Sequence, residues 1–163
     1  MLKRKLTLKT QLFALAALLA LIAPALADTT PQIVHVGLID PSVIKGANIT
    51  GAAMMKHDMM ALRADITEVK TGKIEFQATN FSHAFQHEMI VVSVDDPTKP
   101  LPLEASVSKA DEKKFTSMGE VSELPAGKSG SLSVELKPGK YLLICNVPGH
   151  LIAGMSMPFT VTQ

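Results

Sequence analysis

The sequence has 163 residues, of which 47% are hydrophobic and 19% are charged, and its formal net charge is +1. It contains no basic run and no patch of interleaved basic and aromatic residues, so nucleic acid is not an expected partner. Its single cysteine, Cys145, excludes an internal disulfide.

Residues 1–27 have the features of a secretory signal peptide. Four basic residues precede an apolar run that ends in the small residues Ala25 and Ala27. A membrane anchor is the alternative, but the run is short for a span of about 20 residues and ends in a cleavage pattern. We therefore expect export to the periplasm, and no stable membrane insertion after cleavage. Residues 28–163, with 12 basic and 15 acidic residues, should form a single domain.

The remaining chain contains short β-rich segments separated by glycine, proline and aspartate. They are residues 32–40, 61–69, 72–80, 87–94, 129–136, 137–145 and 157–163. Short strands at near-regular spacing predict an all-β domain, an antiparallel sandwich or barrel. Pro138 and Gly139 predict a turn, because proline presets one φ angle and glycine permits a positive one.

Two stretches do not fit the strand pattern. Residues 45–60 are rich in glycine and alanine and then in methionine and histidine. Residues 95–115 are rich in proline and then in charged residues, which predicts a long excursion with one helical turn near 109–115.

The stretch CNVPGHLIAGM places Cys145, His150 and Met155 at equal spacing. A nucleophilic cysteine with a histidine base is one interpretation, but the short, strand-rich chain lacks a protease signature around the cysteine. Two histidines, a cysteine and a weak axial methionine instead form the blue-copper electron-transfer site. His87, directly before the apolar run MIVV, is the better candidate for the second histidine, and His83 is expected in a solvated turn.

At these residues the sequence resembles the cupredoxin family, from about residue 60 to the C-terminus. The resemblance rests on TGKIEFQATN, on Asn80 seven residues before HEMIVV, on LKPGKYLLIC and on CNVPGHLIAGM. The last spacing is similar to that of rusticyanin- and auracyanin-type members. The resemblance implies a Greek-key β-sandwich with one type 1 copper, and its ligands would be His87, Cys145, His150 and Met155.

One position departs from the family pattern, and two others have a simpler expected role. Glu88 follows the first histidine where asparagine or serine is common in the family, and a carboxylate there would alter the local field. The resemblance suggests that Asn80 supports the ligands from behind. His35 alternates with valines along a strand, so we expect it to face outward.

Two functions follow from the resemblance. In the first, the protein is a one-electron carrier, not an enzyme. His150 is its electron port, and Leu151 and Ile152 either form a docking patch for a transient redox partner or only cap the copper pocket. In the second, it is a copper-handling protein for tolerance or homeostasis. Its auxiliary Cu(I) site would use the soft ligands Met54, Met55, His57, Met59 and Met60. A flexible hydrophobic loop, with Met60 entering a strand, is the alternative for that segment.

Overall fold

The computed structural model describes residues 30–43, 60–104 and 106–163. Within these ranges the chain is almost entirely β-structure. The strands are β1 (Gln32–Ile39), β2 (Ala61–Ala64), β3 (Glu68–Lys70), β4 (Gly72–Asn80), β5 (His87–Val94), β6 (Leu103–Glu104), β7 (Lys109–Ala110), β8 (Thr116–Leu124), β9 (Ser129–Leu136), β10 (Gly139–Ile144) and β11 (Ser156–Thr162). The two short 3-10 helices are η1 (Pro41–Val43) and η2 (Glu112–Lys114). Among the residues described, no helix has the length and apolar character needed to cross a lipid bilayer.

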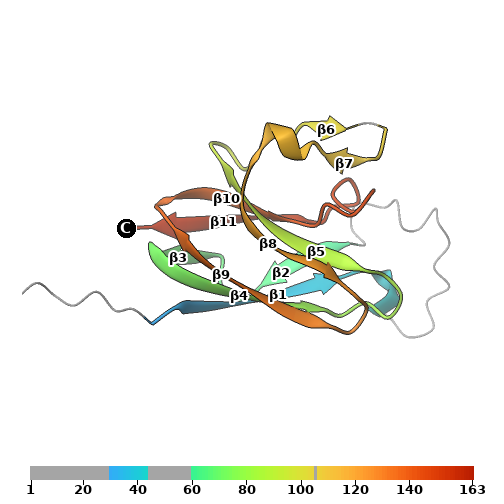
Figure 1. Cartoon of the computed structure of the whole chain (residues 1–163), viewed down its shortest axis with the longest axis horizontal. Helices are drawn as coiled ribbons and strands as arrows, with labels where there is room; N and C mark the ends of the chain where they lie inside the picture. Colours follow the sequence, from blue (N-terminus) through green and yellow to red (C-terminus); the bar gives the residue numbers. More distant parts are fainter. Residues whose placement is uncertain (1–29, 44–59, 105) are drawn as a thin grey trace, which may run out of the picture.

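Two sheets pack face to face as a β-sandwich (Figure 1). The first has the strand order β2-β1-β4-β9, and the second has the order β3-β11-β10-β5-β8. The connections β4–β5, β8–β9 and β9–β10 each cross from one sheet to the other. This crossing agrees with the β-sandwich that the resemblance implied.

The structure corrects three details of the predicted strands. Residues 61–69 fall in two strands of different sheets, because β2 ends at Ala64. The next residue, Asp65, exchanges hydrogen bonds with the backbone of His35: its Oδ1 accepts from His35 N, and its N–H donates to the His35 carbonyl. The sheets are mixed, since β1 runs parallel to β4 and β3 runs parallel to β11. The chain bends at Pro138 as predicted, but Gly139 does not have a positive φ angle.

The main core lies between the sheets. It includes Phe76 of β4 and Phe159 of β11, whose rings meet edge to face at 5.2 Å between centroids. Alternate residues of β4 are buried, as expected for a strand with one face on the core.

A second, smaller core explains the continuous apolar run of β5. Met89 and Val91 face the main core, whereas Ile90 and Val92 belong to a cluster on the other face of the sheet. Residues of the predicted excursion cover that face, among them Phe115 next to η2. The strand is therefore buried on both faces, and burying apolar surface stabilises its position.

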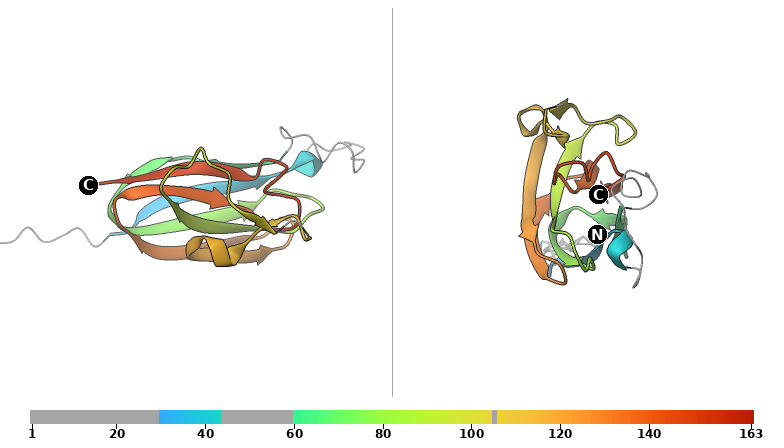
Figure 2. Two further views of the ribbon diagram at one scale, coloured as in Figure 1. Left: turned by 90° about the horizontal axis from the view of Figure 1, so that it is seen from above. Right: turned by 90° about the vertical axis from the view of Figure 1, so that its right-hand side faces the viewer.

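The candidate site lies at the end of the sandwich opposite the C-terminus. The β4–β5 connection, η1 and the β10–β11 connection all reach that end (Figure 1). In the end-on panel of Figure 2, η1 and the β10–β11 connection face the viewer.

Candidate metal centre

The backbone brings the four predicted ligand residues to one end of the second sheet. His87 is the first residue of β5, Cys145 directly follows β10, and Met155 directly precedes β11. Cys145 N donates to the Met155 carbonyl at 3.0 Å, and Met155 N donates to the His150 carbonyl at 3.0 Å. Gly149, with a φ angle of +83°, gives this loop its tight turn.

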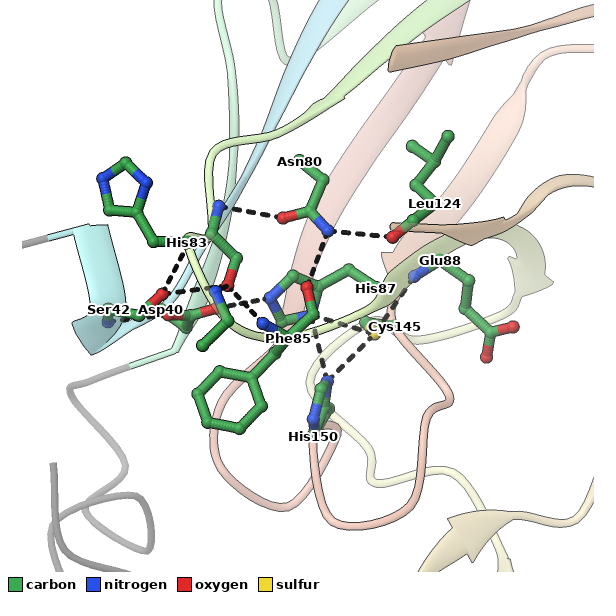
Figure 3. A network of polar contacts seen from close by, with 12 residues as sticks. Asp40, Ser42, Asn80, His83, Phe85, His87, Glu88, Leu124, Cys145 and His150 are labelled. Carbon is green, nitrogen blue, oxygen red and sulfur yellow. Dashed lines mark hydrogen bonds and ion pairs between the residues drawn. The ribbon is translucent and has the colours of Figure 1, made fainter. Parts of the chain in front are cut away.

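Three side chains converge on a common point in the interior. The ligand atoms of His87, Cys145 and His150 all lie within 4.8 Å of one another. Cys145 Sγ is 3.5 Å from His150 Nδ1 and 3.8 Å from His87 Nδ1, and the two Nδ1 atoms are 3.0 Å apart (Figure 3). Each ring thus points the same nitrogen at the sulfur.

His87 has a charged partner that the sequence did not reveal. Its Nε2 lies 2.7 Å from Oδ2 of Asp40, and both side chains are fully buried. Burial raises the pKa of Asp40, but hydrogen bonds from Ser42, Ser82 and His87 outweigh it, so this pKa lies below its usual value. Burial lowers the pKa of His87 despite the carboxylate. The pair is therefore a neutral imidazole donating Nε2–H to an anion.

This assignment fixes the hydrogen between the two rings. With its proton on Nε2, His87 can only accept at Nδ1. The 3.0 Å contact then requires that His150 donates from its own Nδ1 in the metal-free protein. A metal ion held by both Nδ1 atoms would replace this hydrogen bond.

The environment of Cys145 and His150 favours uncharged forms when no metal is bound. Burial raises the pKa of the Cys145 thiol to about 12. Burial and the neighbouring His87 lower the pKa of His150 to about 4. A cation at the site would reverse this preference for the thiol, because coordination deprotonates it.

Glu88 meets the site through its backbone and not through its carboxylate. Its N–H points at Cys145 Sγ, 3.5 Å away, while the side chain is directed away from the cluster (Figure 3). Among the described side chains, Glu88 Oε1 is the one buried polar atom without a hydrogen-bond partner. Burial raises the pKa of this carboxyl.

Two buried asparagines brace the connections that carry the ligands. Asn80 Nδ2 donates to the carbonyls of Phe85 and Leu124, each at 2.9 Å, and holds the segment before His87. Asn146, next to the cysteine, accepts from Ala110 N at 2.7 Å and so ties the cysteine loop to β7. The resemblance pointed to Asn80, whereas no sequence signal pointed to Asn146.

The remaining candidate residues are not part of this three-residue cluster. Met155 is fully buried in the main core beside the cluster, and Met60 is also a core residue. Met54, Met55, His57 and Met59 lie outside the described residues, as do the predicted signal peptide and its cleavage position. His83 and His35 are exposed, as predicted.

Known proteins share this architecture. No family model matches the chain. Forty residues are 52% identical to auracyanin-B of Chloroflexus aurantiacus, a stretch that spans 24% of this chain and only 17% of that relative. The structure of auracyanin A, a "blue" copper protein from the same species, superposes with a TM-score of 0.51 at 21% identity, over 82% of this chain and 100% of that one. Rusticyanin from Thiobacillus ferrooxidans gives a TM-score of 0.52 at 15% identity, over 80% and 76%. The chain has the cupredoxin fold.

Proposed function

We propose that this protein binds one copper ion through His87, Cys145 and His150, with Met155 as a weak axial ligand. The observation that carries the proposal is the buried cluster of two Nδ1 atoms and one sulfur within 4.8 Å. A protein with the same fold is described as a "blue" copper protein.

The donor set fits copper by its chemistry. Thiolate and imidazole together suit a copper ion that changes between Cu(I) and Cu(II), and a distant thioether completes the blue-copper ligand set. Met155 is buried next to the cluster and is placed by backbone bonds to both Cys145 and His150. We propose its thioether as the axial donor because Met155 lies in the same loop as Cys145 and His150 and is buried.

The function that we propose is one-electron transfer, without catalysis of a substrate reaction. Bound copper would supply the Cu(I)/Cu(II) couple. The chain supplies a fixed cage, because β5, β10 and the braced loops hold the donors in place before the metal binds. A cage that does not rearrange keeps the energetic cost of changing oxidation state small.

Electrons would pass through His150. It is 8% exposed, whereas His87 and Cys145 are completely buried. Ile152, two residues later, is 41% exposed and borders an apolar hollow of about 410 Å³. Leu151 also borders this hollow, but it is partly buried against the second, smaller core that contains Ile90 and Val92. We assign the surface formed by Leu151 and Ile152 to the docking of a transient redox partner. The partner would be periplasmic, because the amino-terminal signal would deliver the protein to the periplasm.

Copper handling is the second candidate function. Ile39 of β1 pairs with Ala61 of β2, so Met60, which ends the methionine- and histidine-rich segment, lies near the end of β1 that also carries Asp40. An auxiliary Cu(I) site would use Met60 together with Met54, Met55, His57 and Met59, which lie outside the described residues. Growth of a deletion strain on excess copper separates the two candidates. Deleting an electron carrier that has no role in tolerance should leave copper resistance unchanged, whereas deleting a copper-handling protein should lower it.

The proposal is tested by adding Cu(II) to the purified protein and to the Cys145→Ala variant. The wild type should bind one equivalent with intense thiolate-to-copper absorption. The variant should lose this absorption completely, because the chain has no other thiol. His83→Ala is the matched control and should keep the spectrum. A coloured Cys145→Ala protein, or a colourless wild type, would refute the assignment.

A further inference from the structure

The carboxylate behind His87 has a role in the metal centre that the ligand set alone does not assign. We propose that Asp40 is a positioning residue that fixes the tautomer of His87 and places a permanent negative charge beside the metal, and so lowers the reduction potential. The effect on the reduction potential rests on the proposed copper site. The effect on the tautomer of His87 concerns the metal-free chain and does not depend on that proposal.

The tautomer follows from the contact geometry. Oδ2 of Asp40 is 2.7 Å from Nε2 of His87, and a carboxylate can only accept. The proton of the neutral ring must therefore be on Nε2, which leaves the lone pair of Nδ1 directed at Cys145 and His150. A ligating histidine commonly gives its second N–H to such a partner, which orients the ring and increases its basicity.

The carboxylate is itself held by residues that follow strands β1 and β4 of the first sheet. Its Oδ1 accepts from Ser42 N at 2.7 Å, and the Ser42 hydroxyl lies 2.9 Å from that of Ser82. Ser82 Oγ also accepts from the backbone of Ala84 and Phe85 in the β4–β5 connection. Asp40 follows β1 in the first sheet and His87 begins β5 in the second, so the contact joins the two layers at the metal end.

The charge bears on the oxidation state. With copper bound to the Cys145 thiolate, the site would carry one net positive charge as Cu(II) and would be neutral as Cu(I). Asp40 adds one negative charge to both states without exposure to water, so it stabilises the more positive state more strongly. One electron from a donor therefore enters less readily than it would at the same site without the carboxylate.

The test compares Asp40→Asn, Asp40→Leu and, as the matched control, Asp65→Asn. Asp65 lies 2.7 Å from a ring nitrogen of His35, but at the surface. Ring-nitrogen NMR on the metal-free proteins reads the tautomer of His87. Voltammetry and Cu(I) titration against a competing chelator read the loaded proteins.

We expect the wild-type His87 to carry its proton on Nε2. Asp40→Asn can still accept this hydrogen bond, so the tautomer should persist while the reduction potential rises. Asp40→Leu should lose the tautomer preference and bind copper about 10- to 100-fold more weakly. Asp65→Asn should match the wild type in every measurement.

Two results would overturn the inference. One is a wild-type His87 protonated on Nδ1, a measurement that does not depend on whether any variant folds. The other is a pair of Asp40 variants with the potential and affinity of Asp65→Asn. Failure of the wild type to bind copper would refute the proposed function, and the NMR result would still decide the role of Asp40.

Discussion

The described part of the chain contains two histidine–aspartate pairs with the same contact distance and different surroundings. His87–Asp40 and His35–Asp65 each place a ring nitrogen 2.7 Å from a carboxylate oxygen. The first pair has no exposed side-chain surface, whereas the side chains of the second are 63% and 45% exposed. Water competes for the second pair and screens its charges, but it cannot replace either partner in the first. Distance alone therefore does not identify the pair that matters for function.

Removing the histidine from each pair should give the largest contrast. His87→Ala leaves the buried Asp40 carboxylate without its ring donor, and leaving a buried acceptor unpaired costs about 1–3 kcal/mol, or more when the acceptor is charged. It also removes a proposed ligand, so the blue-copper absorption should disappear. His35→Ala should keep the absorption and change the free energy of unfolding by at most about 1 kcal/mol.

Denaturant unfolding of the metal-free proteins and Cu(II) titration measure the two effects. His83→Ala serves as the control for loss of a nearby surface histidine and should resemble the wild type. If His83→Ala removed the colour and His87→Ala retained it, the ligand assignment would have to move along the chain.

Lowering the pH should destabilise the metal-free protein through the buried cluster. The pKa of His150 falls from its usual 6.5 to about 4 in the folded chain. Between these values the unfolded state binds a proton that the folded state does not, so stability falls as pH falls, by up to about 1.4 kcal/mol per pH unit for this group. His150→Gln should flatten the pH dependence in this window, because the glutamine side chain does not titrate.

Urea titrations at a series of pH values measure this effect. Bound copper should keep the folded protein stable to lower pH, because a proton must displace the metal before it can bind to His150. A metal-free protein that is equally stable at both ends of the window would contradict the burial argument.

Most strands of the fold could be predicted from local sequence patterns, but not all of them. Residues 72–80, 87–94 and 129–136 have the bounds of β4, β5 and β9, because their side chains follow a strand period or form one continuous apolar run. Strand β8 was not predicted. Most of its residues are partly or fully exposed, and Gly119 within it has a φ angle of +136°, so its sequence shows neither a clear strand period nor a continuous apolar run.

The site divides in a similar way. Cys145, His150 and Met155 share one loop and a spacing that can be seen in the sequence, and His87 adjoins a strand. Asp40 could not be found because it lies 47 residues before His87, and only the packing of two sheets brings them together. A contact between residues so far apart in the chain cannot be predicted from the spacing of residues within one segment.

The smallest effect should come from the coupling within the exposed pair. A double-mutant cycle with His35→Ala and Asp65→Ala isolates the side-chain contact, and an exposed pair of this kind contributes about 0–1 kcal/mol. Asp65 Oδ1 also accepts from the backbone N–H of His35 at 2.9 Å, so Asp65→Ala alone should cost more than the coupling. The coupling should shrink further in high salt, because exposed charges are screened. The same cycle with His87→Ala and Asp40→Ala should give a larger coupling that is insensitive to salt. Equal couplings in the two cycles would show that burial does not distinguish the pairs, and the reason for assigning Asp40 a special role would be lost.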